Sequence, residues 1–271
     1  MKGKKMNQYI TEAQWQHFDN EGYVRIGQVA DDQMLATIQQ RMDDIMLGKA
    51  PLDYDKIMMQ LDREPGTDKP GPQSNGHKGA TLLYRKIQML EHDPVFLSYM
   101  KNPVFQEVCT RIYGLGTPIT CLRAMFMNKP AHEGTRLTWH QDRWTDLDID
   151  PQITIYTALD PATIENGCIH IVPRSHNKLI NPSNGSGFLT QEQIDELLAE
   201  CQPMPVELEA GEVVLLHNWT LHSSSTNQTD IPRRAFSICY MDAATKSDRG
   251  TKFPLIFGKN SLSVEQLEAK V

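Results

Sequence analysis

His140 and Asp142, separated by one glutamine, and the distant His222 are the residues of this chain best suited to bind a metal. Alternate residues of a β-strand point to the same side, so His140 and Asp142 can reach one ion together if their segment is extended. His222 must then come from a separate strand that lies alongside. Two histidines and one carboxylate form a ligand set of non-haem iron(II) that leaves positions open for other ligands. We therefore expect an iron(II) site formed by these three residues.

Arg233 extends this pattern from a metal site toward a co-substrate. It follows His222 in the chain and offers a planar, charged fork that matches a carboxylate. A keto acid can bind iron(II) through its keto oxygen and one carboxylate, and a dicarboxylate has a second carboxylate for this arginine. The pattern predicts an oxygenase that uses iron(II), a keto acid and O2.

Two other histidines compete for the metal role. His17 and Asp19 have the same spacing as His140 and Asp142, but their segment is expected to form a short capped helix. Residues two apart on a helix do not face each other, so this pair is interpreted as structural. His217 lies five positions before His222 and would point to the opposite face if one strand covered both.

The segments that must position these residues change character near residue 118. Beyond it, short runs that favour strands are separated by turn residues, and this spacing is typical of a β-sandwich or barrel. We therefore expect the β core at 118–245. A capping box of Thr190 and Gln193 indicates a helical insertion at 190–200. The expected strands are Ile119–Asn128, Ile153–Leu159, Cys168–Val172, Val213–His217 and Ala235–Met241.

Residues 1–117 are expected to be mainly helical, with one long loop. Apolar residues recur at helical spacing over 32–46, and 94–113 is a second helical region. Residues 62–80 are rich in glycine, proline and lysine without periodicity, which indicates a lid or a disordered segment. Since we find no linker or internal repeat, we treat 1–271 as a single domain.

Composition excludes several classes of protein. The net charge of −7 without a basic stripe argues against a nucleic-acid partner. No apolar run is long enough to span a bilayer, and none follows the basic N-terminus as in a signal peptide. The five cysteines are scattered, which predicts neither a zinc ribbon nor a disulfide framework and favours the cytoplasm. A soluble protein that acts on a small molecule is the interpretation that remains, with the oligomeric state left open.

Five motifs occur in order along the chain: Phe18-Asp-Asn-Glu-Gly-Tyr23, Phe126-Met-Asn-Lys-Pro130, Trp139-His-Gln-Asp142, Glu165-Asn-Gly-Cys168 with Val172-Pro-Arg-Ser-His176, and His222-x-Ser224-x-x-Asn227 with Arg233 and Arg234. Together they resemble the phytanoyl-CoA dioxygenase (PhyH) family of Fe(II)- and 2-oxoglutarate-dependent oxygenases. One departure is Arg174, which stands where the family often has glycine in a P-G-S-H motif.

The resemblance implies a fold and roles for individual residues. It implies a mainly β protein with flanking helices, built on a double-stranded β-helix (a cupin-like jelly roll). It makes His140, Asp142 and His222 the iron ligands. It implies that 2-oxoglutarate is bound by Arg233 and Ser224, with Lys86 and Tyr156 beside it.

The reaction and substrate are expected in outline. Family halogenases replace the metal carboxylate by glycine or alanine, so the presence of Asp142 favours hydroxylation of an aliphatic C–H bond, with release of succinate and CO2. The alternatives are desaturation, cyclisation or epimerisation by the same oxidative chemistry, an acyl-CoA hydroxylase, or a non-catalytic jelly roll that binds metal and ligand. Candidate substrate-contacting residues are Arg123, Met125, Arg143, Trp144 and Trp219.

Overall fold

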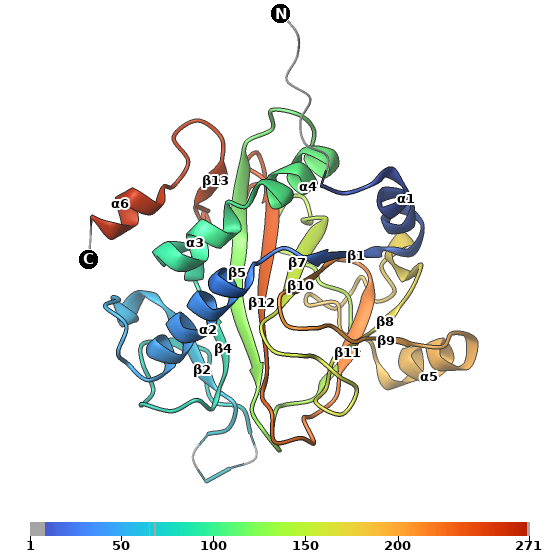
Figure 1. Cartoon of the computed structure of the whole chain (residues 1–271). Coiled ribbons are helices and arrows are strands. Elements are labelled where there is room, and N and C mark those ends of the chain that lie inside the picture. The colour runs from blue at the N-terminus through green and yellow to red at the C-terminus, as the bar shows by residue number, and fades with distance from the viewer. Residues whose placement is uncertain (1–8, 65, 68, 270–271) are drawn as a thin grey trace, which may run out of the picture.

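The computed structural model describes residues 9–64, 66–67 and 69–269, shown in Figure 1. Its helices are α1 (Glu12–Glu21), α2 (Asp32–Met46), α3 (Pro94–Met100), α4 (Pro103–Tyr113), α5 (Gln191–Glu200) and α6 (Val264–Glu268). Its strands are β1 (Tyr23–Gln28), β2 (Met58–Leu61), β3 (Ser74–Asn75), β4 (Tyr84–Gln88), β5 (Ile119–Lys129), β6 (Leu137–His140), β7 (Ile153–Ala158), β8 (Ile169–Val172), β9 (Met204–Val206), β10 (Glu212–His217), β11 (Leu221–Ser224), β12 (Arg233–Asp242) and β13 (Leu255–Phe257).

The strands form two antiparallel sheets, as the predicted jelly roll requires. The larger sheet has the order β1-β10-β7-β12-β5-β4-β2-β3, and β13 pairs with β5 at one end. The smaller sheet has the order β6-β11-β8-β9. Tyr156, Val214 and Ala235 of the larger sheet form one apolar cluster with residues of the smaller sheet. The two sheets therefore pack face to face, with strands far apart in sequence brought side by side.

Alternate side chains of β5 face the apolar core on one side of the sheet and a cavity on the other. Ala124 and Phe126 are fully buried in the core under the helices. Arg123, Met125 and Met127 point the opposite way and line a cavity. Because alternate residues of a strand face opposite sides, one strand both closes the core and presents charged side chains to the interior of the jelly roll.

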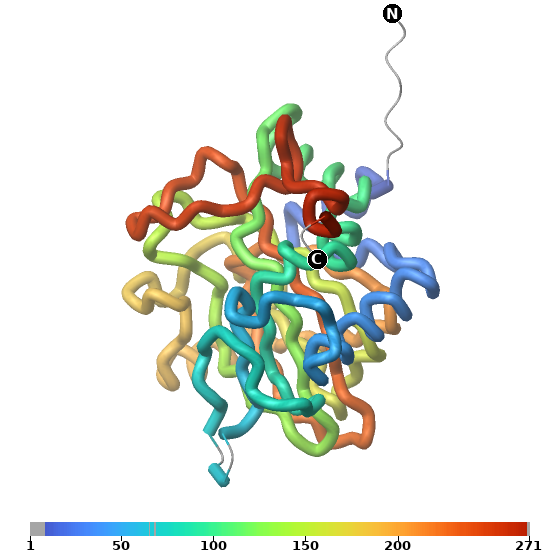
Figure 2. The backbone as a smooth tube through the Cα atoms, turned by 90° about the vertical axis from the view of Figure 1, so that its left-hand side faces the viewer, coloured from blue at the N-terminus to red at the C-terminus, as the bar shows by residue number. Residues whose placement is uncertain are grey.

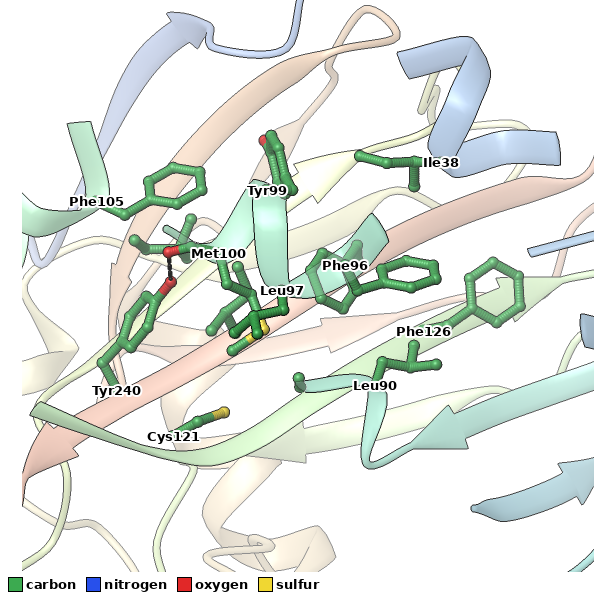
Figure 3. Close-up of a cluster of buried hydrophobic side chains, with 14 of the residues drawn as sticks. Ile38, Leu90, Phe96, Leu97, Tyr99, Met100, Phe105, Cys121, Phe126 and Tyr240 are labelled. Carbon is green, nitrogen blue, oxygen red and sulfur yellow. Dashed lines mark hydrogen bonds between the residues drawn. The ribbon is translucent and has the colours of Figure 1, made fainter. Parts of the chain in front are cut away.

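All the helices except α5 pack on the core of the larger sheet, and α5 packs against the smaller sheet. Phe96, Tyr99 and Met100 of α3 lie on β5 and β12, as Figure 3 shows, and the hydroxyl of Tyr240 donates to the carbonyl oxygen of Met100 at 2.6 Å. Figure 2 shows this side of the molecule, where α6 packs beside α3. The core beneath these helices holds the larger sheet rigid behind the cavity.

The strand predictions, all of which lie beyond residue 118, are confirmed, and the structure adds strands before it that were not predicted. Each predicted strand has a counterpart in β5, β7, β8, β10 and β12. The chain before residue 118 also contributes β1–β4, all of which join the larger sheet. These strands are short and half polar, and their partners lie far away in sequence, so no local apolar pattern reveals them.

Two helical predictions are confirmed, one with a correction. The capping box predicted at Thr190 is present, because its hydroxyl accepts from the backbone of Gln193 at the start of α5. The helical region at 94–113 is divided into α3 and α4. Asn102 caps α4 and precedes Pro103, and a residue before proline avoids the helical conformation.

The segment 62–80 is attached to the sheet at several points. β3 lies within it and pairs with β2. The carboxylate of Asp62, which is 1% exposed, accepts from the backbone nitrogens of Gly134 and Thr135 at 3.2 and 3.1 Å. Residues 65 and 68 lie outside the described residues, and the predicted lid function stays a prediction, as does the single-domain organisation. No helix in the described part of the chain has the length and apolarity needed to cross a bilayer.

Candidate metal and co-substrate site

The three candidate metal ligands meet where β6 and β11 pair. His140 is the last residue of β6 and lies opposite His222 of β11. Asp142 follows two residues beyond the end of β6, where its backbone nitrogen donates to the carbonyl oxygen of Asn218 at 2.7 Å. The expectation that one strand carries both members of the pair is therefore wrong for Asp142. Ligand atoms of the three residues nevertheless lie within 4.8 Å of one another.

Backbone contacts orient both histidine rings for a metal. Nδ1 of His140 lies 2.9 Å from the carbonyl oxygen of Thr138, and Nδ1 of His222 lies 2.9 Å from that of Thr220. A carbonyl can only accept, so each Nδ1 carries the proton and each Nε2 keeps a free lone pair, the form in which histidine binds metals. Burial, reinforced by the neighbouring His222, lowers the pKa of His140 to about 3. The donor set thus fits a divalent cation with one negative ligand.

Gln141 supports the site from the side opposite the metal. Its side chain is fully buried, and its Nε2 donates to the carbonyl oxygens of Lys178 and Trp219 at 2.8 and 2.7 Å. Its Oε1 accepts from the backbone nitrogen of Ile180 at 2.8 Å. These bonds tie two loops, one with Lys178 and Ile180 and one with Trp219, to the residue between the candidate ligands. The sequence analysis did not assign Gln141 a role, although its position between two candidate ligands is a signal.

Phe188 is a second residue that the sequence analysis missed. Its ring stacks on His140 with centroids 4.7 Å apart. The preceding Gly187 has a φ of +69°, and a Cβ there would overlap the carbonyl oxygen of Gln141. Glycine is therefore required for this loop to approach β6 closely.

Arg233 presents a buried donor that has no partner. It is 4% exposed, and its terminal nitrogens donate to the Tyr156 hydroxyl at 2.8 Å and the Gly167 carbonyl oxygen at 3.0 Å. Its Nε is buried without a hydrogen-bond partner, and no described carboxylate forms an ion pair with it. Arg234 points away and pairs with Asp160 at 2.7 Å. A buried guanidinium without a counter-ion fits an anionic ligand.

Ser224 and Lys86 line the same cavity as Arg233. Ser224 is buried on β11, two residues beyond His222. Burial, followed by repulsion from Arg123 and Arg85, lowers the pKa of Lys86 to about 8. An anion in the cavity would offset that repulsion. The residues predicted to bind 2-oxoglutarate thus converge on one space.

The cavity has a volume of about 770 Å³ and lies between the two sheets. Of the candidate substrate residues, four line it: Arg123, Met125, Arg143 and Trp144. Trp219 is not among the lining residues, and its Nε1 is buried without a partner behind the metal pair. The structure therefore does not bring Trp219 together with the other candidates.

Arg174 shows how the chain accommodates its departure from the P-G-S-H pattern. Its φ is +69°, the left-handed conformation that glycine adopts readily. Its guanidinium also binds Glu21 at 2.8 Å. The turn expected of a glycine is therefore retained with arginine in its place.

A jelly roll that carries this triad and a buried arginine in one cavity has the features of the non-haem iron(II)- and 2-oxoglutarate-dependent oxygenases. The family described as phytanoyl-CoA dioxygenase (PhyH) matches residues 18–235. The chain belongs to this family. It is an enzyme of the iron(II)- and 2-oxoglutarate-dependent class, and His140, Asp142 and His222 are placed where they could hold the predicted iron.

Relatives and solved structures agree with this assignment. The chain is 32% identical over 165 residues to phytanoyl-CoA dioxygenase domain-containing protein 1 of Mus musculus, covering 56% of this chain and 55% of that protein. The match thus spans about half the length of that relative. EctD from S. alaskensis, solved with 2-oxoglutarate and 5-hydroxyectoine, superposes with a TM-score of 0.67 at 19% identity, covering 90% of this chain and 80% of EctD. The epimerase SnoN from nogalamycin biosynthesis gives 0.66 at 18% identity, covering 91% and 98%. Both likenesses confirm the predicted fold.

Proposed function

We propose that the protein is a dioxygenase that hydroxylates an aliphatic C–H bond of a small molecule and releases succinate and CO2. The observation that supports this most is the presence, in one cavity, of the triad and of Arg233 with its unpaired Nε. His140, Asp142 and His222 would hold the iron, and Arg233 would hold the far carboxylate of 2-oxoglutarate. Iron and 2-oxoglutarate, when bound, supply the chemistry that activates O2 and oxidises the substrate.

The side chains of the protein supply orientation and exclude water. The Tyr156 hydroxyl and the Gly167 carbonyl oxygen each accept from one terminal nitrogen of Arg233 and fix its guanidinium at the cavity, with Nε left unpaired. Ser224 adds a hydroxyl from β11, and Lys86 adds a positive charge from β4. None of these groups has to act as a nucleophile, which agrees with the lack of a paired nucleophile and base among the residues lining the cavity.

Other outcomes of the same oxidative chemistry are the second candidate. The fold is shared with proteins described as an epimerase and a carbocyclase, so this architecture also serves epimerisation and cyclisation, and desaturation is a further alternative. Product analysis by mass spectrometry separates these outcomes: gain of one oxygen supports hydroxylation, and loss of two hydrogens or no change in mass overturns it. A location in the cytoplasm stays a prediction, and so does the lack of a nucleic-acid partner.

Anaerobic titration of the metal-free protein tests the proposal. Addition of iron(II) and then 2-oxoglutarate should produce the visible charge-transfer band of a keto acid bound to iron(II). Arg233→Gln should weaken 2-oxoglutarate about tenfold or more, because charge-assisted hydrogen bonds are worth about 1.5–3 kcal/mol. Arg111→Gln, which removes an exposed arginine paired with Asp19, is the matched control and should leave the titration unchanged.

Two results would overturn the proposal. A flat spectrum from a folded protein would mean that the site does not assemble with both ligands. A normal band without succinate formation under O2, for any substrate of a broad screen, would favour a jelly roll that binds its ligands without turnover.

A further inference from the structure

The cavity carries a charge opposite to that of the whole chain. Eight arginine and lysine side chains line it, against two aspartates, Asp142 and Asp146. The chain as a whole has a net charge of −7. Positively charged side chains are thus concentrated around the cavity. Burying a charge without a partner is unfavourable in free energy, so these side chains favour an anionic ligand.

The proposed cofactors account for only part of this positive charge. Asp142 would be shared with the iron, which itself adds two positive charges. The two carboxylates of 2-oxoglutarate would be taken by the iron and Arg233. Asp146 already pairs with Arg249 at 3.5 Å. Several cations therefore remain without a matching anion even when the site is fully loaded.

Arg123 is the remaining cation nearest to the metal site. Its Nη2 lies 3.3 Å from a carboxylate oxygen of Asp142, and its side chain is 19% exposed. Its guanidinium lies over the ring of Trp144, 5.3 Å from the centroid. Its Nε is buried and has no hydrogen-bond partner. Once Asp142 binds a divalent cation, its charge is no longer available to Arg123 alone.

Arg143 offers a second buried donor on the same wall. It follows Asp142 and precedes Trp144, and its Nε is also buried without a hydrogen-bond partner. Its Nη1 donates to the carbonyl oxygen of Pro182 at 2.6 Å, and the carboxylate of Asp150 lies 4.0 Å from its Nε. These contacts hold the side chain at the cavity wall, where Asp150 is its ion-pair partner and its Nε makes no hydrogen bond. The Trp144 ring, which Arg123 covers, lines the same cavity as both arginines.

We propose that the substrate is a small organic anion whose carboxylate or phospho group is bound by Arg123 and Arg143 beside Trp144. This inference rests on the proposed function, because it places the anion next to the iron that would oxidise the neighbouring carbon. The anionic group and the oxidised C–H bond are then close together in the substrate. A long thioester, whose charges lie far from the carbon that reacts, does not meet this condition.

Calorimetry with simple probes tests the anion site. The protein is loaded anaerobically with iron(II) and saturating 2-oxoglutarate, and is titrated with butyrate, ethylphosphonate and the neutral butyramide. The two anions should bind saturably, and butyramide should bind at least about tenfold more weakly. The stronger of the two anions identifies the carboxylate or the phospho group as the preferred one. Because the Arg123 side chain covers Trp144, binding should also change the tryptophan fluorescence of the protein.

Variants locate the binding site. Arg123→Gln and Arg143→Gln should each weaken the anions about tenfold or more, while Arg111→Gln should not. The charge-transfer titration with 2-oxoglutarate, repeated in Arg123→Gln and Arg143→Gln, reports whether the metal site still assembles. Arg123→Lys keeps the charge but loses the planar fork, and should recover part of the affinity.

The outcomes separate this inference from the proposed function. Equal binding of butyrate and butyramide, or unchanged anion affinity in Arg123→Gln, overturns the anion site even if the charge-transfer band is normal. Loss of anion binding in Arg233→Gln but not in Arg123→Gln places the probes in the co-substrate site and also overturns it. Anion binding that depends on Arg123, in a protein that gives no band, supports the anion site and overturns the proposed function.

Discussion

Glu91 makes the stability of the fold depend on pH. Its side chain is 7% exposed beneath β5, and one carboxylate oxygen has no hydrogen-bond partner. Burial raises its pKa from the ordinary 4.5 to about 7, although the backbone nitrogens of Glu91 and Ala124 partly stabilise the charged form. The folded protein therefore keeps a proton that the unfolded chain releases at lower pH.

The sign and size of the effect follow from this pKa. Between pH 4.5 and 7 the folded state binds more protons than the unfolded state, so the free energy of unfolding falls as the pH rises. Each pKa unit is worth about 1.4 kcal/mol, so Glu91 costs about 3 kcal/mol above pH 8. Between pH 5 and pH 8 the change is about 2.5 kcal/mol.

Glu91→Gln removes the titration and keeps the shape of the side chain. We expect the variant to gain about 2.5 kcal/mol over the wild type between pH 5 and pH 8, measured by urea unfolding. Glu200→Gln, at the exposed end of α5, is the matched control and should show no such trend. A constant difference between Glu91→Gln and the wild type across this range would refute the reasoning.

Three further predictions concern the site. Asp142→Ala should lose iron(II) affinity and with it the charge-transfer band, while circular dichroism shows a folded protein; a normal iron titration would contradict the assignment of the ligand. Tyr156→Phe removes the hydroxyl that holds Arg233 and should weaken 2-oxoglutarate by a few-fold to about tenfold, since one hydrogen bond is worth about 0.5–1.5 kcal/mol; an unchanged titration midpoint would exclude this positioning role. Gln141→Leu leaves three backbone groups of two loops without their partner and should cost about 2–4 kcal/mol in thermal or urea unfolding, in contrast to the exposed Gln191→Leu.

The spacing of a few residues was sufficient to predict the chemistry of the site. His140, Asp142 and His222 have side chains that only a metal site would combine in this way, and Arg233 adds a fork for a carboxylate. The inferences about the metal and the carboxylate depend only on the chemical identity of side chains, which can be read from the sequence. The same holds for the short capped helix that removes His17 from consideration, because caps and helical periodicity are local.

The partners of each strand were not predictable in the same way. β1 lies at one edge of the larger sheet against β10, and nothing in Tyr23–Gln28 indicates that neighbour. The support that Gln141 gives to the metal pair comes from segments near Lys178 and Trp219. Such contacts join residues far apart in the chain, and a local pattern of apolar and polar residues carries no information about them.

By itself, then, the sequence determined which groups could bind iron(II) and a carboxylate, because ligand chemistry belongs to the side chains. Only the tertiary structure decided that His222 pairs across from His140 and that Trp219 lies outside the cavity. It also decided that Arg123 and Arg143 line the cavity, each with a buried Nε that makes no hydrogen bond. The physical reason is that burial and missing hydrogen bonds depend on how distant segments pair and pack. Which side chains are buried, and which donors lack a partner, is therefore defined only when the two sheets are packed around the cavity.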